Sequence, residues 1–122
     1  MNEEEELFFA GRPEAFMLYE SFRKRLMHDV PEARVKVSKT QISFFLSRMF
    51  ACVSFLPVKR KAERGDVFIT VTFSLPYMNG NERCVCSNPC PGHFTHHVLV
   101  RNLSDIDDEL MIWINEAADA AS

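Results

Sequence analysis

The sequence predicts an α+β domain of two layers, in which an antiparallel sheet of four or five strands carries an N-terminal and a C-terminal helix on one face. Residues 69–75 alternate large apolar with small polar side chains, as a strand with one buried side does. Apolar stripes at helical spacing lie before and after the strand-rich middle of the chain. Short turns separate the expected strands, and short turns connect antiparallel neighbours.

The composition indicates an ordinary globular protein that forms a single domain over residues 1–122. Of its 122 residues, 47% are hydrophobic and 25% are charged, as in ordinary globular proteins. A chain of this length can bury its own core. No apolar run approaches the roughly 18 residues of a membrane span, and the four consecutive glutamates at residues 3–6 are unlike a secretory signal. We therefore expect a cytoplasmic protein without membrane contact. In that reducing compartment we expect the four cysteines to be thiols rather than disulfides.

The first helix is expected to follow a frayed acidic tail at residues 1–6. Pro13 fits the first turn of a helix, because the amide hydrogen that proline lacks has no partner there. Pro31 ends the helix, since the residue before a proline is driven out of the helical region. One apolar stripe runs along this helix and is formed by Ala15, Leu18, Tyr19, Phe22 and Leu26.

The middle of the chain predicts consecutive strands. Residues 33–39 alternate valine with polar, mostly basic residues, and form either a loop or an edge strand whose lysines discourage further pairing. Residues 42–46 and 50–56 are expected to form the next two strands. The basic run at residues 59–66 is expected to be an exposed hairpin loop that leads into the strand at residues 69–75.

The second half of the sheet is expected to follow an Asn-Gly turn at residues 78–81. A strand over residues 83–86 is then broken by the proline-rich residues 87–92, and residues 94–101 form the last strand. These two segments complete the four or five strands of the predicted sheet.

The last helix is expected to begin at Ser104, as its N-cap, with Asp107 three residues on in an acidic variant of the capping box. Further acidic residues in the first turns favour the positive end of the helix dipole. The apolar stripe of this helix consists of Ile106, Leu110, Trp113, Ile114 and Ala117. Both terminal helices can therefore cover the same face of the sheet.

Several segments in the same order resemble a bacterial family known as domain of unknown function, number 5655. They are residues 8–15 with 18–20, residues 39–44, 50–51, 73–76 and 95–98, and the stretch 107–113 of the last helix. The resemblance covers nearly the whole chain. It implies no established reaction and no catalytic residue, and the cysteine-bearing residues 84–90 lie outside the family pattern.

Basic residues are concentrated in the middle of the chain. Between Arg23 and Arg64 the net charge is +8, against −11 for the rest of the chain. A basic sheet face with interleaved aromatic rings can bind single-stranded nucleic acid, although a pI near 5.8 is unlike that of a dedicated nucleic-acid binder. The alternative is that these charges are solvated or lie beside the acidic part. The candidates for a basic face are Arg34, Lys36, Arg48, Lys59, Arg60 and Lys61.

A second group of candidates is polar and falls in the segments that match the family. These residues could line a small pocket that opens at the sheet, with His96 and His97 on opposite faces of their strand. A cysteine paired with either histidine, oriented by an acid of the last helix, would make an enzyme. The alternative is that these side chains only brace the strand and satisfy backbone groups. The candidate ligand-binding residues are Lys39, Thr40, Ser43, His96 and His97.

The third candidate is a zinc site formed by cysteines and histidines between Cys84 and His97. Zinc takes four such ligands, but one residue between Cys84 and Cys86 is not the usual chelating spacing. The alternative is that these residues are thiols in a turn and histidines in a sheet. The possible ligands are Cys84, Cys86, Cys90 and His93.

Taken together, the sequence favours a binding module without catalysis, cofactor or bound metal. Its ligand would be a protein, a phosphate-bearing molecule or, less in keeping with the pI, nucleic acid; a second copy of the chain is also a possible partner. A small enzyme with a pocket around His96 and His97, and a zinc-stabilised interaction module, are the alternatives.

Overall fold

The computed structural model describes residues 1–90 and 92–122, with the backbone alone at residues 88–90. Its helices are α1 (Glu3–Phe8), α2 (Pro13–Asp29), α3 (Lys61–Arg64) and α4 (Asp108–Ala121), with a short 3-10 turn, η1 (Leu103–Asp105), before α4. Its strands are β1 (Arg34–Val37), β2 (Gln41–Phe45), β3 (Met49–Ser54), β4 (Ile69–Leu75), β5 (Cys84–Cys90) and β6 (His93–Val100).

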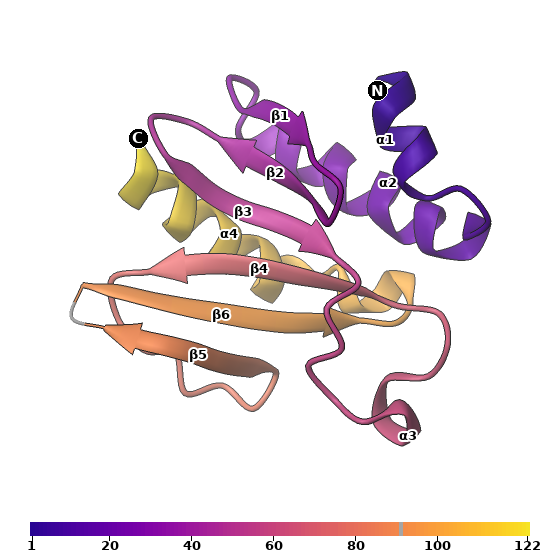
Figure 1. Ribbon diagram of the computed structural model, residues 1–122. Helices are drawn as coiled ribbons and strands as arrows, with labels where there is room; N and C mark the ends of the chain where they lie inside the picture. Colours follow the sequence, from indigo (N-terminus) through magenta and orange to yellow (C-terminus); the bar gives the residue numbers. More distant parts are fainter. Residues whose placement is uncertain (91) are drawn as a thin grey trace.

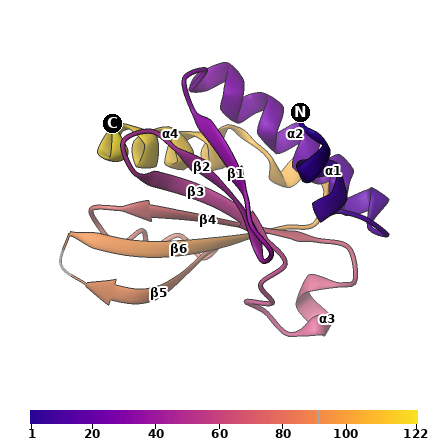
Figure 2. The ribbon, with the colours of Figure 1, turned by 45° about the horizontal axis from the view of Figure 1, so that its top comes forward.

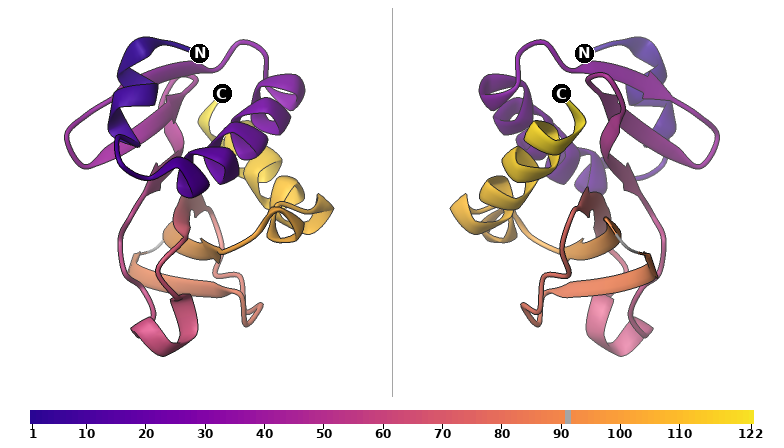
Figure 3. Two further views of the ribbon diagram at one scale, coloured as in Figure 1. Left: turned by 90° about the vertical axis from the view of Figure 1, so that its right-hand side faces the viewer. Right: turned by 90° about the vertical axis from the view of Figure 1, so that its left-hand side faces the viewer.

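The strands form one antiparallel sheet in the order β1-β2-β3-β4-β6-β5 (Figure 1). The segment at residues 33–39, which the sequence left open between loop and strand, supplies the edge strand β1, so the sheet has six strands rather than four or five. Helices α2 and α4 lie side by side on one face (Figure 2), and no helix covers the middle of the other face in the described part of the chain (Figure 3). The α+β class and the helices on one face are confirmed.

The face beneath the helices holds the core. Ile69, Val71, Phe73 and Leu75 of β4 are each at most 1% exposed, as their alternation predicts. Residues opposite one another on neighbouring strands share a face, and the partners of this β4 row on β3 and β6 are also apolar, apart from His96 opposite Phe73. The buried side chains of α2 are the five of its predicted stripe.

The acidic segment at the N-terminus is a helix, where the sequence predicted a frayed tail. Asn2 caps α1, because its side-chain oxygen accepts the Glu5 amide at 2.9 Å. The Glu5 carboxylate is fully buried and accepts hydrogen bonds from the Tyr19 hydroxyl and from Arg23 Nε, the latter at 2.7 Å. Burial raises the pKa of Glu5, but these donors outweigh it and hold the pKa below its usual range. The buried ion pair thus fixes a segment whose composition alone indicates disorder.

The last helix begins later than the sequence predicted. Ser104 lies in η1, and Asp107 is the N-cap of α4, where its carboxylate accepts the Leu110 amide at 3.0 Å. Asp107 also pairs with Arg83 at 3.0 Å, a contact that holds the cap against the start of β5. Both residues fit the preferences of an N-cap, and a partner distant in sequence decides between them.

Two further segments differ from prediction. The connection at residues 59–66, expected to be a loop, contains the single turn of α3. Strand β5 runs to Cys90, although residues 87–92 were expected to break it; its register against β6 shifts between Ser87 and Cys90. None of the helices in the described part of the chain has the length and apolar character needed to span a membrane.

Candidate ligand-binding pocket

A cavity of about 640 Å³ lies on the sheet face opposite α2 and α4, and we call it the sheet pocket. Three segments meet there: the β1–β2 turn, the α1–α2 connection, and the chain at and beyond the end of β3, all at the same end of the sheet (Figure 1). The lining residues are Phe8, Ala10, Arg12, Lys39, Thr40, Gln41, Cys52, Ser54, Phe55, Leu56, Thr72 and His97.

The floor of the sheet pocket belongs to a polar row that crosses four strands. The pairing register places Ser43 opposite Cys52, Cys52 opposite Thr72, and Thr72 opposite His97. These residues alternate with the core residues of their strands, so the row faces away from the helices. A sheet with one apolar face therefore presents hydrogen-bonding groups on the other.

His97 uses both ring nitrogens within this row. Nδ1 is 2.8 Å from Thr72 Oγ1, and Nε2 is 2.8 Å from Ser87 Oγ. The side chain is buried, and this burial, together with the neighbouring His96, lowers the pKa of His97. We therefore expect a neutral imidazole at pH 7, in which one nitrogen donates and the other accepts.

The walls are held by backbone and aromatic contacts. The Thr70 hydroxyl donates to the Leu56 carbonyl at 2.7 Å, which fixes the chain just beyond β3. The Phe8 ring stacks on Phe55 at 5.4 Å with an interplanar angle of 12°. Gln41 donates to the Ser43 hydroxyl at 2.9 Å and is thereby oriented at the pocket edge. The walls are thus partly apolar and partly polar, as in small-molecule sites.

The charge of the sheet pocket is positive. Arg12 and Lys39 both line it, and among the described residues neither has a carboxylate within 4.0 Å. The Arg12 guanidinium lies 3.9 Å from the centre of the Phe55 ring, a cation–π contact that positions the cation. No Asp or Glu is found among the described residues of the lining. This local excess of positive charge stands out in a chain whose net charge is −3.

The described lining of the sheet pocket contains no activated cysteine. Cys52 is 5% exposed, and burial raises the pKa of its thiol in spite of a hydrogen bond from Thr72. A thiol of this kind stays protonated and is a poor nucleophile. Cys52 therefore acts as part of the floor.

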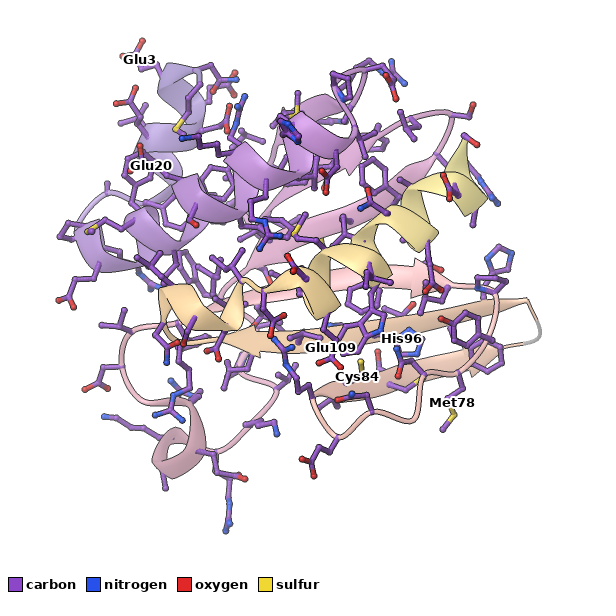
Figure 4. All side chains as sticks on the ribbon, turned by 180° about the vertical axis from the view of Figure 1, so that it is seen from behind. Glu3, Glu20, Met78, Cys84, His96 and Glu109 are labelled. Carbon is purple, nitrogen blue, oxygen red and sulfur yellow. The ribbon has the colours of Figure 1, made fainter. Side chains whose placement is uncertain are left out.

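The ligand-binding candidates separate into two groups. Lys39, Thr40 and His97 come together in the sheet pocket, and Ser43 lies in the same polar row beside it. His96 points the other way, into the core beneath α4, where it is fully buried (Figure 4).

The surroundings of His96 are those of a core residue. Its ring stacks on Phe73 at 5.5 Å, and its Nε2 accepts the Asn79 amide at 2.9 Å. Burial lowers the pKa of His96. The two histidines therefore do not converge on one pocket.

The basic-face candidates lie on separate parts of the molecule (Figure 1). Arg34 donates to the Leu46 carbonyl at 2.8 Å, Lys36 is exposed on the edge strand β1, and Arg48 donates to the Ala120 carbonyl at the end of α4. Arg60 and Lys61, beside Lys59 at the opposite end of the sheet, pair with Glu63 at 3.6 Å and Asp66 at 3.3 Å. The six residues thus fall into two groups, one on β1 and the β2–β3 turn and one at α3.

The possible metal ligands do not form a common site among the described residues. Cys84 and Cys86 lie on the helix-facing side of β5, opposite Val98 and His96. Burial raises the pKa of Cys84 to about 11. The described residues contain no group of three or more His, Cys, Asp or Glu side chains placed to hold a metal ion, and the side chain of Cys90 lies outside them.

Sequence reasoning missed Arg12, Phe55 and Thr72. Arg12 lies outside the basic middle of the chain, directly before the proline that begins the first helix. Its position did contain a signal, because N-caps are usually Ser, Thr, Asp or Asn, and the Arg12 side chain makes no capping hydrogen bond.

Comparison with known proteins places the chain in a family. No curated protein and no solved structure matches it significantly. A family model described as "Domain of unknown function (DUF5655)" matches residues 5–120, nearly the whole chain. The chain therefore belongs to the DUF5655 family.

Proposed function

We propose that this protein is a non-catalytic binding domain whose sheet pocket takes a small phosphate-bearing molecule. The observation that supports this most strongly is the pairing of two cations, Arg12 and Lys39, in one cavity whose described lining contains no carboxylate. Guanidinium and ammonium groups are the side chains that bind phosphate oxygens best. At the floor, His97 holds the Thr72 hydroxyl, and a hydroxyl that accepts from the Nδ1–H of His97 keeps its own O–H to donate to a phosphate oxygen.

The shape and chemistry of the walls favour a small organic molecule over a bare ion. The cavity of about 640 Å³ falls within the range of ligand sites. Phe8, Phe55 and Leu56 provide an apolar wall that can cover the carbon skeleton of a ligand. We place this function in the cytoplasm, where the free thiols of Cys52, Cys84 and Cys86 remain reduced.

A second candidate function, hydrolysis by a serine nucleophile, rests on the 2.8 Å distance between Ser87 Oγ and His97 Nε2. A serine and a histidine base at this distance are two parts of a catalytic triad. The third position is occupied by Thr72, a neutral hydroxyl, which cannot stabilise an imidazolium as a carboxylate does. The binding function therefore has the stronger support.

The test is a titration of isotope-labelled protein with phenyl phosphate at low salt, followed by NMR. Amide shifts are expected to cluster around Lys39, Thr72 and His97. Replacing Arg12 by Gln or Lys39 by Gln should weaken binding about 10-fold or more each, since charge-assisted hydrogen bonds contribute about 1.5 kcal/mol or more.

The matched control is Lys24→Gln, which removes one positive charge from the exposed surface of α2, away from the pocket. It should leave the affinity unchanged within about 2-fold, as expected for a distant, solvent-screened charge. Shifts scattered over the surface, or equal losses of affinity in Lys24→Gln and Arg12→Gln, would contradict the proposal.

A further inference from the structure

A second cavity adjoins the sheet pocket. It has a volume of about 450 Å³, and Arg12 and Phe55 line both cavities. Its other walls are the first turn of α2 and the segment around α3, and we call it the α3 cavity. The two cavities therefore meet at the Arg12 side chain, where it stacks on Phe55.

The α3 cavity has a positively charged wall of its own. Arg64 lines it, and the guanidinium lies 5.0 Å from the centre of the Phe68 ring. One of its terminal nitrogens donates to the Gly65 carbonyl at 3.1 Å, whereas its Nε is buried without a hydrogen-bond partner in the described structure. A buried donor without a partner costs about 1–3 kcal/mol and requires an explanation.

The other charged groups of the α3 cavity leave it cationic. Lys61 pairs with Asp66 at 3.3 Å, but both side chains are more than 70% exposed. An ion pair this exposed contributes little to stability. Glu14 is the other acid of the lining, against the cations Arg12, Lys61 and Arg64. The first turn of α2 borders the same space, and the positive end of its dipole adds to the attraction that the cations exert on an anion.

Resting on the proposed function, we propose that the ligand carries two phosphate groups joined by a short linker. One phosphate lies in the sheet pocket between Lys39 and Arg12, and the other lies in the α3 cavity at Arg64. Arg12 stands between them and can contact both, because its guanidinium has five N–H donors. The linker passes over the Arg12–Phe55 stack.

The experiment compares alkanediol bisphosphates of increasing chain length with the monophosphates of the same alcohols, by calorimetry on the full chain. The expected result is one chain length that binds about 10-fold more tightly than its monophosphate, as one further charge-assisted contact provides. A flat dependence on chain length, with no gain over the monophosphate, would overturn the inference.

Four variants locate the second phosphate. Arg64→Gln should abolish the gain of the bisphosphate and leave monophosphate binding unchanged, whereas Lys39→Gln should weaken both. Arg64→Lys, which keeps the charge and the packing stem, should retain part of the gain. Lys59→Gln removes a charge from the same segment but lines neither cavity, so the gain should persist.

The outcomes separate this inference from the proposed function. If neither phosphate class binds, the proposed function fails and the inference fails with it. If monophosphates bind through Lys39 and Arg12 but Arg64→Gln keeps the bisphosphate gain, only the inference fails. Oligothymidylates whose affinity rises with length and falls in Lys59→Gln would indicate a nucleic-acid surface and would also overturn it.

Discussion

His96 and His97 are neighbours in the chain, yet they belong to different regions of the molecule. His96 faces the helices, stacked on Phe73 in the core, whereas His97 faces the uncovered side of the sheet and joins Thr72 to Ser87. Both rings are buried, and burial lowers the pKa of each. Burial and a shifted pKa therefore do not distinguish a structural histidine from one in a binding site; the cavity beside the ring does.

The largest expected difference between the two faces is in stability. Phe73→Ala should lower the free energy of unfolding by about 3–5 kcal/mol, because it empties a fully buried site between His96 and Trp113. Thr72→Val, one residue away on the other face, should lower it by about 1 kcal/mol, the loss of one hydrogen bond. Urea denaturation measures both, and equal losses would remove the distinction between the faces.

The pH dependence tests whether both histidines are neutral in the folded state. Because their pKa values are lowered, the unfolded chain binds more protons than the folded one below its histidine pKa of about 6.5. The contribution of the two histidines to stability should therefore be constant above about pH 7 and fall as the pH drops below 6.5, by at most about 1.4 kcal/mol per pH unit for each histidine.

The single variants His96→Leu and His97→Gln should each reduce this slope between pH 6.5 and 5. Each comparison is made with wild-type protein at the same pH values. A slope that neither variant changes would show that folding does not lower the pKa of either histidine.

Ligand binding should distinguish the two histidines more sharply than stability does. His97→Ala should weaken phenyl phosphate binding about 5-fold by removing the side chain that holds the Thr72 hydroxyl in place at the floor of the sheet pocket. His96→Leu should leave the affinity unchanged, since His96 lies on the other face. Calorimetry at a pH above 7 measures both, and the reverse order would place the site under α4 instead.

The smallest expected effect concerns Ser87. The partner of His97 Nδ1 is Thr72 rather than an acid, so Ser87 should not be activated as a nucleophile. A fluorophosphonate probe should therefore label the wild-type protein no faster than the Ser87→Ala variant. Rapid labelling of Ser87 that is lost in His97→Ala would instead support the hydrolase function.

Local patterns predicted the core and the main elements. The alternation in β4 and the five-residue stripe of α2 need only the period of a strand or helix, so both could be identified without partners. The helix α1 could not, because Glu5 is stabilised by Tyr19 and Arg23, which lie 14 and 18 residues away. The N-cap of α4 was misplaced for the same reason, since Arg83 favours Asp107.

The candidate site was predicted in part. Lys39, Thr40 and His97 share the sheet pocket, and the opposite directions of His96 and His97 follow from the two-residue period of a strand. Arg12 and Phe55 were not recognised, because their roles come from the α1–α2 connection folding back beside the end of β3. The local sequence marks Arg12 only as an unusual N-cap, and it does not show that the side chain lies beside Phe55.

The hydrogen bonds of the His97 ring also connect the pocket to the border of the sheet. Thr72 is on β4 and Ser87 is on β5, so the ring on β6 links three adjacent strands through side chains. Strand β5 has a backbone partner on one side only among the described strands. A molecule that draws on Thr72 or His97 would therefore alter solvent protection of amides near Ser87, making hydrogen exchange at this outer strand a distant reporter of occupancy.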